Sequence, residues 1–181
     1  MSLSVSTAIA HAVLSVSSAY AISQTSDCVF AVLGFVLYFI NGILGIVAYG
    51  AASGVKVYKF YTSFLFVSLS LSLPLFVSQL YFDSGFPKSL TFMHFAPFII
   101  SLFTGTFRTH DHPLQILHLA SMVYISLSNR YYYGITTAFS FVIAIYAIGP
   151  IGMILNTPSR DLFNYALSFT VYFLVQTLRG R

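Results

Sequence analysis

Glutamate and tryptophan are absent from this sequence, cysteine occurs once, and charged residues of either sign are scarce. Charged residues fill 7% of the 181 positions, whereas soluble domains contain about 25%. Too little charge is therefore present to cover the surface of a water-soluble globule. The single cysteine, Cys28, excludes a disulfide within the chain and a zinc centre made of several thiolates. The lack of glutamate argues against a di-iron oxidase or desaturase, which depends on several carboxylates.

The basic residues are too scattered to indicate nucleic-acid binding. Eight lysines and arginines contribute to a formal net charge of +4, but a nucleic-acid surface needs such residues clustered on one face or stripe. Isolated cations between apolar stretches are typical of the flanks of membrane spans. The sequence also lacks the motifs of serine hydrolases, zinc proteases, P-loop enzymes and dinucleotide-binding enzymes. We therefore predict no nucleic-acid partner and no cofactor, and we assign no catalytic residue.

Long apolar runs make up most of the chain. Hydrophobic residues fill 57% of it, and its mean hydropathy is +0.85. A helix needs about 20 residues to cross the hydrocarbon core of a bilayer, and charges and turn residues divide the sequence into segments near that length. We predict an all-α fold, a polytopic transmembrane helical bundle with short loops that forms a single integral membrane domain over residues 1–181. The predicted spans cover about residues 4–23, 28–50, 57–82, 88–106, 113–129, 133–155 and 160–178.

The number and the orientation of these spans stay open. The fifth segment is so short that six spans are an alternative to seven. Lysine and arginine divide equally between the two sides of a seven-span arrangement, so the positive-inside rule gives no orientation. Ala19-Tyr20-Ala21 fits a signal-peptide cleavage site, but no basic residue precedes it, and we expect the first segment to remain as a span. The shorter segments fit a thin membrane such as that of the endoplasmic reticulum.

The most polar stretch is the turn His110-Asp111-His112, followed by His118 in the fifth predicted span. Two or three imidazoles with a carboxylate can bind a divalent metal or act as acid and base on a lipid headgroup. The alternative is a turn in which Asp111 caps the following helix. Successive residues of a turn point in different directions and do not converge easily on one ligand, so we predict no metal site and keep these four residues as candidates.

Two further histidines, His11 and His94, fall within predicted spans. Titratable groups inside the hydrocarbon region are candidates for a function. The alternative is that each histidine is neutral and forms a hydrogen bond with a hydroxyl group on a neighbouring helix. No charged residue lies inside a predicted span away from its ends, which argues against a proton relay based on carboxylates, a voltage sensor or a charged ion pathway.

Asn41 and the pair Gly149-Pro150 interrupt two otherwise apolar spans. Broken helices in transporters expose backbone groups to a substrate cavity near the centre of the membrane, so these three residues are candidates for lining such a cavity. The alternative is structural: a helix kink at Pro150, and an interhelical hydrogen bond from Asn41 beside the small residues Gly42 and Gly45.

These patterns leave three functional hypotheses. The first is a small non-catalytic subunit, assembly factor or scaffold that lies in the lipid bilayer and binds a membrane protein or a second copy of itself. The second is a transporter of a small neutral or weakly polar solute that uses Asn41 and Gly149-Pro150. The third is a membrane-embedded enzyme of lipid metabolism that uses the turn at His110-Asp111-His112 together with His118.

Overall fold

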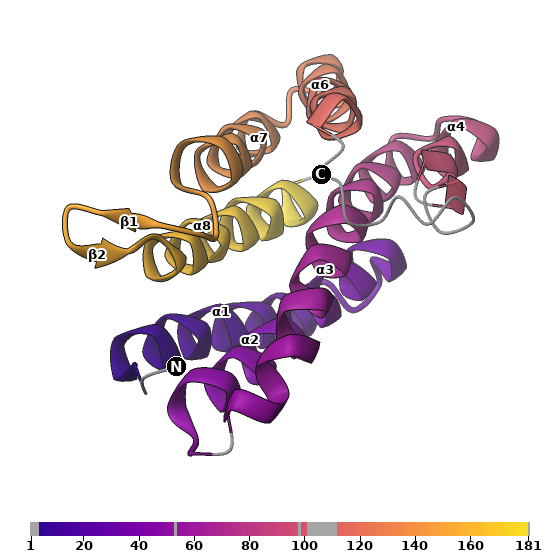
Figure 1. The fold of residues 1–181 in the computed structure, drawn as a ribbon. Helices are drawn as coiled ribbons and strands as arrows, with labels where there is room; N and C mark the ends of the chain where they lie inside the picture. Colours follow the sequence, from indigo (N-terminus) through magenta and orange to yellow (C-terminus); the bar gives the residue numbers. More distant parts are fainter. Residues whose placement is uncertain (1–3, 53, 98, 101–111, 181) are drawn as a thin grey trace.

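The computed structural model describes residues 4–52, 54–97, 99–100 and 112–180, which are mostly helical (Figure 1). The longer helices are α1 (Val5–Gln24), α2 (Val29–Gly50), α3 (Gly54–Asp83), α6 (His112–Ser128), α7 (Tyr132–Val142) and α8 (Ser159–Arg179). The shorter elements are helix α4 (Lys88–Met93), the π-helix η1 (Ile143–Ile148), and the strands β1 (Met153–Ile154) and β2 (Thr157–Pro158). The all-α class is confirmed for these residues, with one small antiparallel hairpin added.

Among the described residues, three helical segments are long and apolar enough to cross a membrane: Val5–Gln24, Val29–Gly50 and Lys56–Asp83. At a rise of about 1.5 Å per residue, the 20 residues of α1 extend about 30 Å, the thickness of a typical hydrocarbon core. The apolar helices Leu114–Ser128 and Tyr132–Ile148 are shorter, and α8 has 21 residues but many polar side chains. The predicted seven-span bundle is therefore not confirmed; a helical protein with three candidate membrane spans is.

Two of the predicted spans differ from the structure at proline residues. The fourth was predicted over 88–106, but α4 ends at Met93 and the chain turns at His94 before helical residues resume at 96–97 and 99–100. The rest of that prediction, 101–106, lies outside the described residues. Pro97 lacks the N–H group that would bond the carbonyl of Met93 in a continuous helix. The sixth was predicted over 133–155, but η1 ends before Gly149, the residue that precedes Pro150. Gly149 has a φ of +69°, which does not continue a helix.

Neighbouring helices close a ring in the order α2, α1, α8, α7, α6 and α3, with α3 packed against α2 again. Helices α1 and α8 run in the same direction (Figure 1). Asn164 near the start of α8 lies beside His11 near the start of α1, and Arg179 at the end of α8 donates a hydrogen bond to Gln24 at the end of α1. The short helix α4 packs against α3. The largest fully buried side chains include Phe35, Tyr38, Tyr61, Phe76, Phe141 and Phe163.

A side chain of α3 accepts hydrogen bonds from backbone N–H groups in the first turn of α2. The Gln79 oxygen accepts hydrogen bonds from the backbone N–H groups of Phe30 at 2.9 Å and Ala31 at 3.4 Å. These donors lack partners within their own helix, and Cys28, which precedes α2, makes no side-chain capping bond. Gln79 therefore fixes the start of α2 against the end of α3.

Candidate functional site

The His11 imidazole is fully buried in the second turn of α1. Its Nδ1 atom lies 2.7 Å from the carbonyl oxygen of Thr7, and its Nε2 atom lies 2.9 Å from the hydroxyl oxygen of Tyr61 on α3. A carbonyl oxygen only accepts, so the proton of a neutral imidazole is on Nδ1, and Nε2 accepts a hydrogen bond from the Tyr61 hydroxyl. Both ring nitrogens therefore have partners within the protein.

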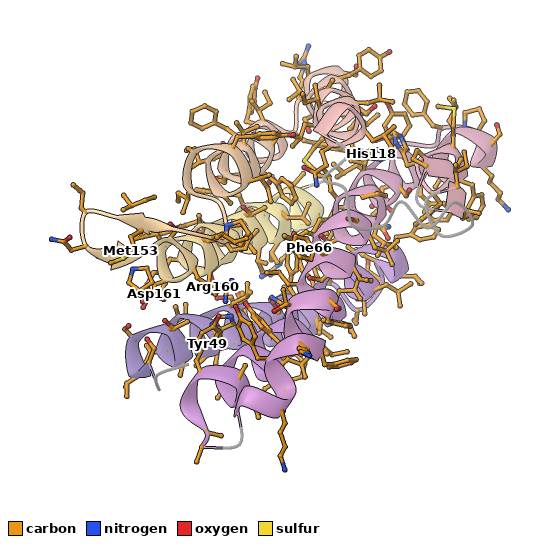
Figure 2. The ribbon with its side chains drawn as sticks, in the orientation of Figure 1. Tyr49, Phe66, His118, Met153, Arg160 and Asp161 are labelled. Atoms are coloured by element: carbon orange, nitrogen blue, oxygen red, sulfur yellow. The ribbon has the colours of Figure 1, made fainter. Side chains whose placement is uncertain are left out.

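Helix α8 brings two more polar side chains to this histidine. The Asn164 amide nitrogen lies 3.3 Å from Nε2 of His11 and 2.8 Å from the carbonyl oxygen of Arg160. The Arg160 guanidinium lies 5.3 Å from the ring centre of Tyr49 and 5.5 Å from that of Tyr61, which are cation–π distances. Figure 2 shows Arg160 and Tyr49 in the space between α8 and the α1–α2 pair. We call these five residues, His11, Tyr49, Tyr61, Arg160 and Asn164, the His11 cluster.

Glycines on α2 make room for this arrangement. A Cβ atom at Gly45 would overlap the His11 ring, and one at Gly42 would overlap the Ser15 hydroxyl. Small residues one helical turn apart let two helices approach closely, as small residues at helix interfaces do in membrane proteins. The absence of side chains at Gly42 and Gly45 therefore decides where the His11 ring lies.

Asn41 lies on α2 one turn before Gly45 and has no exposed surface. Neither its amide nitrogen nor its amide oxygen has a hydrogen-bond partner. Burying an unpaired polar group costs about 1–3 kcal/mol, so this amide lowers stability. The Asn164 oxygen, in the His11 cluster, is also buried without a partner.

The charged residues at the start of α8 correct one expectation from the sequence, which places ionised side chains at the rims of the bundle. Asp161 is only 3% exposed, and one of its carboxylate oxygens is buried without a partner. Arg160 reaches back toward the hairpin, and its Nε–H group donates to the Pro150 carbonyl oxygen at 3.1 Å. A carboxylate is stabilised in the first turn of a helix by the N–H groups there, and a guanidinium is weakly hydrated and stacks on aromatic rings. Both groups can therefore lie deeper than a lysine or an isolated aspartate would.

A second histidine site joins α4 to α6. The Nδ1 atoms of His94 and His118 are 3.1 Å apart, and both residues are buried. The Tyr81 ring of α3 lies 5.0 Å from the His94 ring, centre to centre. Figure 2 places His118 well away from Arg160. Within the described ranges, no three His, Cys, Asp or Glu residues come together as a metal-binding group.

The structure places the predicted candidates in different surroundings. His94 and His118 are brought together, and Pro150 accepts a hydrogen bond from the His11 cluster, while the preceding Gly149 ends η1. Asn41 is buried on α2, one turn before Gly45. The candidate turn His110-Asp111-His112 lies largely outside the described residues, since the first two are not among them and of His112 only the backbone, at the start of α6, is described.

Four residues of the His11 cluster were not predicted. Tyr49, Tyr61 and Asn164 were not singled out in the sequence, and Arg160 counted only among the scattered cations that flank apolar stretches. The signal that marks the α8 pair is the spacing of Arg160 and Asn164, which are four residues apart and therefore share one face of a helix.

No known protein family, curated protein or solved structure matches the chain.

Proposed function

We propose that the chain is a multi-pass integral membrane protein that serves as a non-catalytic subunit or scaffold. The observation that carries this proposal is the bonding of His11, whose two ring nitrogens contact Thr7, Tyr61 and Asn164. A general acid or base needs a ring nitrogen that faces the substrate. The His11 imidazole instead ties α1 to α3 and α8.

Other buried polar side chains support the same proposal because they also connect helices. Ser72 on α3 donates to the Tyr38 hydroxyl on α2 at 2.8 Å, and Ser78 donates to the Thr91 carbonyl oxygen on α4 at 2.8 Å. Hydrogen bonds of this kind hold helices together in a bilayer, where an apolar helix surface packs against lipid as favourably as against another apolar helix. The polar groups therefore stabilise the bundle.

We propose further that the number of spans is odd. Helices α1 and α8 are parallel neighbours, and two helices that cross a bilayer in the same direction are separated by an odd number of intervening crossings. Five or seven spans satisfy this condition, whereas six do not. The start of α1 and the end of α8 would then lie on opposite sides of the membrane.

A subunit should contact its partner through one face. Phe60 on α3, Phe139 on α7 and Phe169 on α8 are similarly exposed, at 61%, 65% and 62%. We expect a photoreactive phenylalanine analogue at one of these positions to give one discrete crosslinked protein in intact cells, identified by mass spectrometry, while the other two positions serve as matched controls. Depletion of that protein should lower the amount of this chain.

The scaffold proposal is wrong if none of the three positions gives an adduct and the purified monomer alone transports or converts a substrate. Both measurements are needed, because contact with lipid also leaves a photoreactive residue without a protein adduct.

The buried amide of Asn41 favours a second candidate function, a carrier of a small neutral or weakly polar solute. Its unpaired nitrogen and oxygen can donate to and accept from one neutral polar molecule. If the chain is such a carrier, proteoliposomes with the purified chain should conduct glycerol or urea faster than protein-free liposomes, and Asn41→Leu should abolish that increase, as measured by stopped-flow light scattering. Gln176→Leu, a polar-to-leucine change near the end of α8, should leave the flux unchanged. Equal flux for Asn41→Leu and the unaltered chain would remove this candidate.

A further inference from the structure

His94 and His118 meet at a position that the rest of the fold holds in place. His94 follows the last residue of α4, whose Thr91 carbonyl is held by Ser78 of α3, and its ring packs on Tyr81 of α3. His118 lies in the second turn of α6, and the two imidazole rings are 5.2 Å apart, centre to centre. Three helices therefore fix the relative position of the two rings.

We infer that His94, His118 and Gln115 form a binding site for a divalent transition metal such as Zn²⁺. Two Zn–N bonds of about 2.0–2.1 Å at a tetrahedral angle place their nitrogen atoms about 3.3–3.4 Å apart. The Nδ1 atoms of His94 and His118 are 3.1 Å apart, so a displacement of a few tenths of an ångström admits the ion between them.

Gln115 is the second observation that points to a ligand. Its side chain is 7% exposed, and its amide oxygen is buried without a hydrogen-bond partner. Gln115 lies three residues before His118, so both side chains occupy the same face of α6. An amide oxygen is an acceptor that can coordinate a metal, which would relieve the cost of burying it unpaired.

The donor set selects the class of metal. Neutral imidazole suits zinc, copper, nickel and iron, whereas calcium and magnesium need oxygen ligands in larger number. Three protein ligands with a water molecule in the fourth position are the pattern of an open zinc site.

Metal binding at the two Nδ1 atoms changes the position of one proton but not the number of protons on the two rings. In the metal-free pair, one Nδ1–H group donates to the Nδ1 lone pair of the other ring. When the metal binds both Nδ1 atoms, the donating ring transfers its proton to its own Nε2 atom, so each ring stays neutral. In the metal-bound site both imidazoles are thus neutral, and each has its proton on Nε2.

The test uses the full chain, without a polyhistidine tag, purified in detergent and titrated with Zn²⁺ by calorimetry and with Co²⁺ by visible absorption. We expect one metal ion per chain and a tetrahedral Co²⁺ spectrum. His94→Ala and His118→Ala should each weaken binding by at least about 100-fold, since even the loss of a group that only orients a ligand costs 10–100-fold. Gln115→Leu should weaken binding, whereas Gln115→Glu, which adds an anionic oxygen, should strengthen it by about 10-fold or more.

Gln24→Leu, at the end of α1, is the control, and it should bind metal like the unaltered chain. The Gln115→Glu variant keeps the test decisive if an alanine variant fails to fold, because it predicts a gain. Absence of stoichiometric binding, or binding that His94→Ala leaves unchanged, would overturn the metal site. These results are independent of the proposed scaffold function, which predicts a partner protein with or without the metal.

Discussion

Gly45→Ala is expected to destabilise the protein, although glycine to alanine inside a helix normally stabilises by about 1 kcal/mol. The new Cβ would overlap the His11 ring. That ring cannot move aside without losing its bonds to Thr7 and Tyr61. Overpacking costs about 1–3 kcal/mol and each lost hydrogen bond about 0.5–1.5 kcal/mol, so we expect a net loss of about 2 kcal/mol or more in the free energy of unfolding, measured by SDS titration in mixed micelles.

Gly50→Ala is the matched control on the same helix. A Cβ at Gly50 would meet the Ala8 Cβ at 3.4 Å, an ordinary contact, so this variant should be as stable as the unaltered chain or slightly more stable. When His11→Ala is also present, Gly45→Ala should lower the free energy of unfolding much less, because the ring that the new Cβ would overlap is no longer there. Equal stability of Gly45→Ala and Gly50→Ala would contradict the packing of His11 on α2.

Arg160→Met is expected to release α8 from the hairpin and from the aromatic rings of α2 and α3. The change removes the hydrogen bond to Pro150 and the cation–π contacts with Tyr49 and Tyr61. A hydrogen bond from a charged donor contributes about 1.5–3 kcal/mol, and a cation–π contact about 0.5–2 kcal/mol. Together these suggest a loss of about 2–4 kcal/mol. Hydrogen exchange should also become faster at the Ser159 amide, which bonds the Gly152 carbonyl at the base of the hairpin.

Arg179→Met makes the same change at the other end of α8. The Arg179 side chain is exposed and donates one hydrogen bond to Gln24, so its loss should hardly change stability. Arg160→Lys keeps the charge but lacks the Nε–H donor, and its stability should lie between those of the methionine variant and the unaltered chain. If the two methionine variants are equally stable, Arg160 is not the link between α8 and the hairpin.

The helices were largely predictable because their signals are local. The predicted spans 4–23, 28–50 and 160–178 lie within one or two residues of α1, α2 and α8. Each is an apolar run bounded by turn or charged residues, and this pattern needs no knowledge of neighbours. The sixth segment was predicted too long, since the break at Gly149-Pro150 was interpreted as a kink within a span.

The site was much less predictable than the helices. His11 and Asn41 were identified because a polar residue stands out in an apolar run, and His94 and His118 for the same reason. Their partners were not, because Tyr61 and Arg160 carry no local mark that distinguishes them from interfacial residues. A helix that is apolar on most sides also has no polar face to show which side points inward.

By itself, the amino-acid order determined that the chain forms apolar helices, where most of them begin and end, and that no large charged surface exists. Those properties depend on the chemistry of residues next to one another. Only the tertiary structure decided that His11 bonds Tyr61 and Asn164 while His94 meets His118. Such contacts depend on which helices become neighbours and on how each is rotated, and here side chains missing at Gly42 and Gly45 set that approach.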